Sequence, residues 1–514
     1  MREKQIRSTK SNFLILFVLR IIKTAMQVLV LSLSAKFFGV SVERDVWIIA
    51  STLILAIDII IWGPINETFR TKFIHIRELE GDNWAIKKTK SLFLFTNVVT
   101  IFLIGIIYLL SNNIANIFMD QGSSLHQLEL LSTLIKILSF SFLFNQVNML
   151  MTSILNAYDI FFVPEIAGFI AAIINVIGIY FLAPIYGIYA LAISYYVNLF
   201  VLFFFLIFYI NKKKIKILPT IQDYNSSYIK DFFLFAFPYY VPYIFSQIYT
   251  LSEKAIANYI NSGSVSMIDY SRKIIDVPSG VMTSTLVTIL LPKLSKSFIN
   301  KEKKDFNDDF FDALNLGLLF YGVLIGILSA FGNLLVDILF NKGRINIDDL
   351  HKIDLLLICY TFSAVTNFMY YIYSYSLLSS KNTRYTAYWG VLPQILMILL
   401  NFIFYRFVGV WIFPITYFFA FLVITLIYKR KYPFLVERNS YLLMFRYILF
   451  ILLLFIIGLA VRNVNFSIIT NIYIEVLLKM ILISLIVIFL VFILKLNERT
   501  MIKTLKNKIF SKTI

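Results

Sequence analysis

The sequence has very few of the residues from which catalytic and metal sites are built. Its 514 residues include one cysteine and three histidines, and the histidines lie far apart along the chain. A single cysteine, Cys359, excludes an intramolecular disulfide and a cysteine-based zinc site. The Walker A, HExxH and GxSxG patterns are also missing. We therefore expect neither catalysis nor ATP hydrolysis, and no bound cofactor or metal.

Charged residues are scarce as well, at 15% of the chain, whereas 59% of the residues are hydrophobic and 17% are aromatic. The mean hydropathy is +0.81. So much apolar surface excludes a soluble globular protein. The formal net charge of +18 could indicate a nucleic-acid partner, but the cations lie in short runs between apolar segments, as in the loops of membrane proteins. We therefore predict a polytopic protein of the lipid bilayer that binds no nucleic acid.

Apolar segments of about 20 residues, the length needed to cross a bilayer, follow one another along the chain. They predict an all-α polytopic membrane protein with about fourteen transmembrane helices. The predicted spans are residues 12–35, 46–66, 91–111, 131–155, 164–184, 187–210, 232–252, 278–297, 314–339, 354–378, 387–407, 409–428, 442–461 and 473–495. Arg20 and Lys23 interrupt the first segment, so we interpret it as an uncleaved helix, with a signal peptide as the alternative.

The positions of the basic residues predict the orientation of the helices. Lys and Arg are concentrated near the N-terminus, in alternate loops and in the C-terminal tail, whereas the loop at 112–129 contains neither. Cytoplasmic loops of membrane proteins carry an excess of Lys and Arg. We therefore expect an even number of spans, with both termini in the cytoplasm.

An internal similarity predicts two related halves. Two segments share the same order of parts: a polar turn, an apolar helix, a glycine turn at Gly187 or Gly409, and a second apolar helix that ends in a basic run. Parallel repeats build some transporters with two lobes around a cavity, although any pair of adjacent membrane helices gives a similar order. We predict an N-terminal six-helix lobe at 1–211, a C-terminal six-helix lobe at 212–431, and an accessory helix pair with a basic tail at 432–514.

The stretch from Gly263 to Phe298 concentrates charge within this apolar chain. Asp269, Arg272, Lys273 and Asp276 lie just before a Pro-Ser-Gly sequence, where we expect the helix to break. Ionisable groups at membrane depth are costly unless they face water or one another. One interpretation is a site for an anionic group, with Asp269 and Asp276 holding the two cations in place. The alternative is an ordinary polar loop between two membrane helices.

A second charge cluster lies in the first two predicted spans. Arg20 and Lys23 share one helix face because they are three residues apart. Asp58, midway along the second span, is the expected counter-ion for one of them. Snorkelling of Arg20 to the interface is the alternative. We also expect the second helix to break at Gly63 and Pro64.

The stretch 263–298 resembles one region of a known family. It contains Gly-Ser-Val-Ser, then a tyrosine followed by Lys273 and Asp276, then Pro-Ser-Gly and Thr-Ile-Leu-Leu-Pro-x-Leu-Ser-Lys. These parts resemble the seventh-to-eighth helix region of the MurJ/MviN lipid II flippases, members of the multidrug/oligosaccharidyl-lipid/polysaccharide exporter superfamily. Phe38-Gly39 followed by Asp45, and the segment 339–348, resemble two further family segments.

The first two helices depart from the family pattern. The two arginines of the family's first helix fall on Thr24 and Val30, and the arginine of its second helix falls on Asp58. This chain has cations at Arg20 and Lys23 instead. This difference weakens the inference that lipid II itself is the substrate. It does not affect the inference that the protein is a flippase.

The resemblance implies a flippase of the bacterial cytoplasmic membrane that moves an undecaprenyl-pyrophosphate-linked glycan, expected to be the peptidoglycan precursor lipid II, by alternating access. It implies a membrane potential or ion gradient as the energy source, and cell-wall synthesis enzymes as partners. Arg20, Lys23, Arg272 and Lys273 would hold the pyrophosphate, with Asp58, Asp276 and Asp45 as counter-ions or coupling residues. The alternatives are a flippase for O-antigen or exopolysaccharide precursors, a cation-coupled drug antiporter of the same superfamily, and a non-transporting scaffold for envelope assembly.

Reporter fusions test the predicted topology. Fusions at Lys88, Lys214, Lys303 and Lys431 should all report a cytoplasmic location, because each lies in a basic segment that the positive-inside rule keeps inside. A periplasmic signal from any one of these fusions would require different helix assignments.

Overall fold

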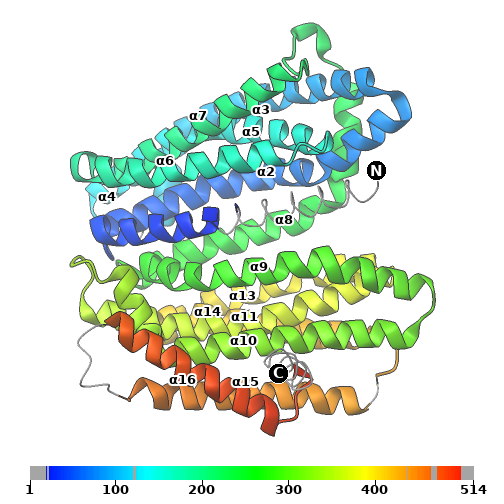
Figure 1. The fold of residues 1–514 in the computed structure, drawn as a ribbon. Coiled ribbons are helices and arrows are strands. Elements are labelled where there is room, and N and C mark those ends of the chain that lie inside the picture. The colour runs from blue at the N-terminus through cyan, green and yellow to red at the C-terminus, as the bar shows by residue number, and fades with distance from the viewer. Residues whose placement is uncertain (1–18, 20–21, 120–122, 437, 465–471, 499–514) are drawn as a thin grey trace, which may run out of the picture. The chain divides into compact units, whose positions relative to one another are not determined.

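The computed structural model describes residues 19, 22–119, 123–436, 438–464 and 472–498, and the regular structure within them is helical (Figure 1). Helical residues 22–38 come first. The later elements are α2 (Val42–Glu80), α3 (Asp82–Phe118), α4 (Leu125–Ser139), α5 (Ser141–Ala157), α6 (Phe162–Tyr186), α7 (Tyr189–Lys212), η1 (Ile221–Asp223), α8 (Ser226–Ile260), α9 (Ser264–Ile299), α10 (Lys303–Phe340), α11 (Ile347–Ser379), α12 (Thr383–Trp389), α13 (Leu392–Val408), η2 (Gly409–Trp411), α14 (Ile412–Lys429), α15 (Arg438–Arg462) and α16 (Ile472–Ile493).

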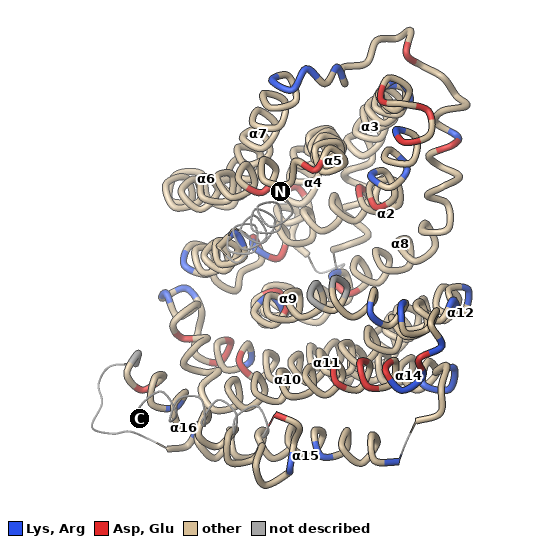
Figure 2. Tube along the Cα trace, turned by 45° about the vertical axis from the view of Figure 1, so that its right-hand side comes forward, with Lys and Arg blue, Asp and Glu red and all other residues tan. Residues whose placement is uncertain are grey.

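The all-helical prediction is confirmed. The predicted spans fall on helical segments, with 131–155 divided between α4 and α5 and 387–407 between α12 and α13. The first half of span 12–35 lies largely outside the described residues. Ten of the described helical segments are long and apolar enough to cross a membrane. Helices suit this solvent because each satisfies its own backbone hydrogen bonds where no water is available. Lys and Arg gather mainly at helix ends and in connections (Figure 2).

Both predicted helix breaks are wrong. Helix α2 continues through Pro64, and α9 continues through Pro278 and Pro292. A proline removes one backbone N–H, and membrane helices tolerate this loss because neighbouring groups and small local adjustments satisfy the freed carbonyl. The charged residues of α9 therefore lie on one long helix.

The chain forms two compact units. Unit 1 comprises Met1–Ser266 and Lys342–Ile345, and unit 2 comprises Met267–Asn341 and Asn346–Ile514. Helix α8 belongs to unit 1, where it packs on α2 and α3. The predicted lobes at 1–211 and 212–431 are based on a similarity between two parts of the sequence. The division by packing does not test that similarity, so the two lobes stay a prediction.

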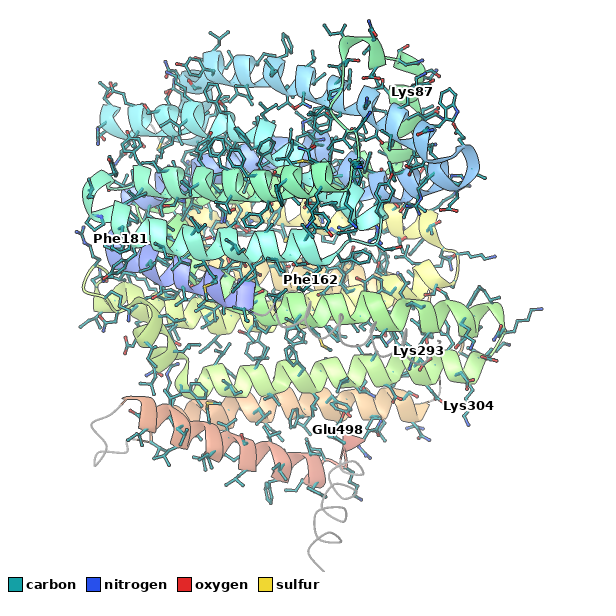
Figure 3. All side chains as sticks on the ribbon, turned by 45° about the horizontal axis from the view of Figure 1, so that its top comes forward. Lys87, Phe162, Phe181, Lys293, Lys304 and Glu498 are labelled. Atoms are coloured by element: carbon teal, nitrogen blue, oxygen red, sulfur yellow. The ribbon has the colours of Figure 1, made fainter. Side chains whose placement is uncertain are left out.

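Helix α2 is the central element of unit 1. It contacts α3, α4, α5 and α8. Its buried face carries Trp62, Phe69 and Phe73, and the ring of Phe69 stacks on Phe232 of α8 with centroids 5.6 Å apart. On the outside of the unit, Phe162 and Phe181 of α6 are exposed apolar side chains (Figure 3), as expected of a lipid-facing surface.

Helix α10 is the central element of unit 2, where it packs on α11, α15 and α16. The contact with α15 is close because a Cβ added at Gly458 would lie 2.8 Å from the carbonyl oxygen of Gly326. A buried ion pair joins Asp354 of α11 to Arg462 of α15. Through these contacts the C-terminal helix pair is packed as part of unit 2.

The two hairpins that suggested an internal repeat have the same local structure. Helices α6 and α7 join at Gly187, with φ of 54°, and α13 and α14 join through Gly409, with φ of 64°. These values lie in the left-handed region, which glycine adopts without the steric cost of a Cβ. The predicted order of parts therefore holds for each hairpin.

Candidate functional site

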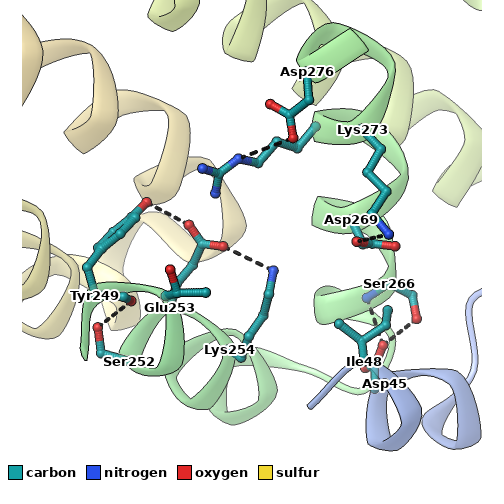
Figure 4. Close-up of polar contacts among 12 residues, drawn as sticks. Asp45, Ile48, Tyr249, Ser252, Glu253, Lys254, Ser266, Asp269, Lys273 and Asp276 are labelled. Atoms are coloured by element: carbon teal, nitrogen blue, oxygen red, sulfur yellow. Dashed lines mark hydrogen bonds and ion pairs between the residues drawn. The ribbon is translucent and has the colours of Figure 1, made fainter. Parts of the chain in front are cut away.

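Asp45 in the first turn of α2 holds the beginning of α9. Its carboxylate accepts a hydrogen bond from the backbone N–H of Gly263 at 2.6 Å. It also accepts from the backbone N–H of Ser266 at 2.7 Å and from the Ser266 hydroxyl (Figure 4). Asp45 is only 1% exposed. The first N–H groups of a helix have no intrahelical partner, so this carboxylate acts as a cap from another element. The predicted counter-ion Asp45 is thus bonded to the start of α9.

Arg44 beside it is equally buried and bonds to the same turn. Its Nε donates to the Ser34 hydroxyl at 2.9 Å and its Nη1 donates to the Ser266 carbonyl at 3.3 Å. Gly39, shortly before α2, has φ of 62°, and a Cβ there would be 2.4 Å from the carbonyl oxygen of Arg344. Both the backbone conformation and the close approach require glycine at this position.

The predicted first-helix cations are only partly described. Arg20 lies outside the described residues. The side chain of Lys23 is half-buried, and its Nζ would lie 3.0 Å from a Cβ at Gly168 in α6. Because Gly168 has no side chain, the Lys23 ammonium group has space to lie against α6.

Asp58 of α2 lies in the interior of unit 1. Its Oδ1 is buried without a hydrogen-bond partner among the described residues. Asp58 interacts electrostatically with Tyr195 of α7, whose hydroxyl is 3.2 Å from the Asn145 amide. The described residues show no ion pair between Asp58 and Lys23.

The four charged residues of α9 form two ion pairs, each within unit 2. Lys273 Nζ is 3.3 Å from Asp269 Oδ1, and Arg272 Nε is 4.0 Å from Asp276 Oδ2 (Figure 4). Both pairs join residues one helical turn apart, as i,i+4 spacing allows. Each of these two carboxylates therefore lies beside one of the cations, and the role of the four residues in binding an anion stays a prediction. Each cation pairs with the carboxylate four residues away along the helix.

The two cations of α9 differ in their surroundings. The Lys273 side chain is 59% exposed, whereas that of Arg272 is 27% exposed. The guanidinium carbon of Arg272 lies 5.4 Å from the ring centre of Tyr417 in α14, a cation–π contact. A planar guanidinium held against a ring can still bind an anion through its N–H groups, and an exposed ammonium provides a mobile charge beside it.

Two further features were missed by sequence reasoning. Glu253 and Lys254 at the end of α8 are buried, with an ion pair of 3.0 Å, and the Tyr249 hydroxyl donates to Glu253 at 2.6 Å. Tyr417 was not predicted because it lies 145 positions after Arg272, and no spacing rule relates them.

The helical architecture, with ten described segments long and apolar enough to cross a membrane, defines a polytopic membrane protein. Residues 34–496 match the family described as "Lipid II flippase MurJ". The chain belongs to this family.

Solved structures support the same fold. A lipid II flippase MurJ in an inward closed conformation has a TM-score of 0.76 and 22% sequence identity, covering 92% of this chain and 98% of that chain. An inward-facing multidrug resistance MATE family transporter has a TM-score of 0.63 at 11% identity, covering 79% of this chain and 94% of that one. An outward-facing MATE family transporter has a TM-score of 0.56 at 12% identity, covering 80% and 92%.

Sequence relatives give the same family. The probable lipid II flippase MurJ of Buchnera aphidicola subsp. Schizaphis graminum is 26% identical over 340 residues, which are 65% of this chain and 66% of that protein. The protein of the same description from Vibrio cholerae serotype O1 is 24% identical over 169 residues, which are 32% of this chain and 31% of that protein. The matched regions therefore span less than two thirds of each relative.

The cap formed by Asp45 predicts a loss of stability on substitution. Replacing Asp45 by Ala leaves the buried N–H groups of Gly263 and Ser266 without their acceptor, at a cost of about 1–3 kcal/mol for each group. Asp45→Asn should lose less because its amide oxygen still accepts. Asp348→Ala is the control, since this exposed acid also lies in the first turn of a helix. Thermal unfolding of the purified protein measures the difference, and equal melting temperatures for Asp45→Ala and Asp348→Ala would contradict it.

The observed ion pairs predict which charge reversals compensate. Lys273→Asp alone places a carboxylate one turn from Asp269, which should cost about 1 kcal/mol. The double reversal Asp269→Lys with Lys273→Asp restores a pair and should recover most of the loss. Lys273→Asp with Asp276→Lys restores no pair and should not. Comparison of the melting temperatures of these variants in a double-mutant cycle distinguishes the two pairings.

Proposed function

We propose that this protein is a flippase that moves an undecaprenyl-pyrophosphate-linked glycan, with lipid II as the principal candidate, across the bacterial cytoplasmic membrane. The observation that carries the proposal is the pair of cations on α9, Arg272 and Lys273, in a chain that belongs to the lipid II flippase family. The family supplies the class of cargo, and the cations supply a means of binding its charged part.

The physical problem is the headgroup. A pyrophosphate cannot cross about 30 Å of hydrocarbon without groups that replace its water. Arg272 can bind phosphate oxygens through two parallel N–H groups, and Lys273 can follow the phosphate as a mobile point charge. Arg20 and Lys23 of the first helix are proposed as further cations for a pyrophosphate. Asp276 and Asp269 hold the α9 cations when no anion is present.

The remaining carboxylates are given separate roles. Asp45 keeps α9 in register through its bonds to Gly263 and Ser266. Asp58, with a buried oxygen that has no hydrogen-bond partner among the described residues, is the candidate for coupling to the membrane potential or an ion gradient. Alternating access is supported by the superfamily structures in inward-facing and outward-facing states. Both termini are assigned to the cytoplasm, and cell-wall synthesis enzymes are proposed to use the product.

Complementation tests the proposal. In a bacterium depleted of its own lipid II flippase, the wild-type chain should sustain growth. The variant with Arg20→Gln and Lys23→Gln should not, because it loses two charges that act at short range in a low-dielectric environment. Lys36→Gln is the control, since this cation is on the same helix but exposed beside the rings of Phe37 and Tyr180.

The outcomes separate the alternatives, provided that membrane levels of the variants are equal. Growth with the double variant equal to wild type would remove the first helix from the site. Failure of the wild-type chain would exclude lipid II and favour another polyprenyl-linked glycan. A cationic drug as cargo would be repelled by these charges, so their removal would improve its transport.

A further inference from the structure

We propose that three tyrosines of unit 2 form a platform on which a sugar ring of the cargo stacks beside the α9 cations. This tyrosine platform consists of Tyr371 and Tyr375 of α11 and Tyr417 of α14. The inference rests on the proposed function and adds to it, since it assigns the saccharide part of the headgroup to named side chains.

The platform is built by helix geometry. Tyr371 and Tyr375 are four residues apart on α11, so they share one face. Their rings are nearly parallel, at 20°, with centroids 6.2 Å apart. Tyr417 of α14 interacts electrostatically with Tyr371 and carries the guanidinium of Arg272 over its ring at 5.4 Å. Two helices therefore direct aromatic rings to the same charged segment of α9.

Polar groups border the aromatic rings. The Asp276 carboxylate interacts electrostatically with the hydroxyls of Tyr371 and Tyr417, and it lies 4.0 Å from Arg272. The Asp276 side chain is 59% exposed, so its oxygens can accept further hydrogen bonds. Gly280, one turn further along α9, is exposed, and a Cβ added there meets no atom within 4 Å. There is therefore open space beside the charged residues.

The three platform tyrosines differ from the tyrosines that only fill the core. Tyr373 and Tyr428 of the same helices are 3% and 0% exposed and pack against other rings. Tyr371, Tyr375 and Tyr417 are half-buried. Tyr371 and Tyr417 adjoin the Arg272–Asp276 ion pair, and Tyr375 stacks on Tyr371. The partly exposed Asp276 carboxylate beside these rings can accept hydrogen bonds from a ligand.

This combination matches the chemistry of a pyranose ring. One face of such a sugar presents C–H groups, which pack on aromatic rings, and its rim presents hydroxyl and acetamido groups. A carboxylate accepts hydrogen bonds from hydroxyls, and a guanidinium donates to ring oxygens or an acetamido carbonyl. Binding sites of this kind combine aromatic surface with a few placed polar groups. Arg272 lies at the junction, where it can contact both phosphate and sugar.

Binding to the full-length protein in lipid nanodiscs tests the inference. The two probes are lipid II and undecaprenyl pyrophosphate, which share the lipid and the pyrophosphate but differ in the sugars. Wild-type protein should bind lipid II more tightly. Tyr371→Leu and Tyr375→Leu should each reduce this preference by about tenfold, a loss of roughly 1.4 kcal/mol, and leave binding of undecaprenyl pyrophosphate nearly unchanged. Tyr371→Phe keeps the ring and should keep most of the preference.

The matched control is Tyr240→Leu, because Tyr240 is a half-buried tyrosine of α8 whose hydroxyl donates to the Ile61 carbonyl, outside the platform. It should not alter the preference. Equal loss of affinity for both probes in Tyr371→Leu, or no loss, would overturn the platform. Equal binding of both probes by wild type would overturn the platform and leave pyrophosphate binding intact. Failure of wild type to bind either probe would overturn the platform together with the proposed function.

Discussion

The start of a helix in apolar surroundings is the constraint on which the site depends. Without water, the first N–H groups of α9 need an acceptor from the protein. Asp45 of α2 supplies it, at 2.6 Å from the Gly263 nitrogen and 2.7 Å from that of Ser266. A negative charge at this end of a helix is also favoured by the helix dipole. The starting point of α9, and hence the positions of Arg272 and Lys273 along it, is set by a carboxylate of another helix.

The periodicity of α9 then places a carboxylate close to each cation, which stabilises the charges in an apolar chain. Each has a carboxylate one turn away, Asp269 for Lys273 and Asp276 for Arg272. Asp269 is almost buried, so its pair with Lys273 is shielded on one side, whereas Asp276 is open to a ligand. The tyrosines around Arg272 add apolar surface to this charge. Charge from α9 and aromatic surface from α14 therefore meet within unit 2.

The amount that could be predicted differs between fold and site. Long apolar segments predicted the helices. The placement of charge among them identified Arg272, Lys273 and Asp276 as candidate site residues. The helix breaks at Pro64 and Pro278 were wrong, because proline disrupts helices in water more than in a membrane protein where neighbours satisfy the freed groups. Tyr371 and Tyr417 could not be predicted as candidate site residues, since aromatic residues make up 17% of this chain and no spacing rule relates these two to Arg272.

The sequence alone determined that the chain spans a membrane as helices, because that property depends on the length and polarity of local segments. It also determined the i,i+4 spacing of the charges on α9. Only the tertiary structure decided that Asp45 holds Ser266, 221 residues away, and that Arg462 pairs with Asp354, 108 residues away. Such partners are selected by the packing of whole helices, and a buried hydrogen bond or ion pair exists only where packing brings its two ends within about 3 Å.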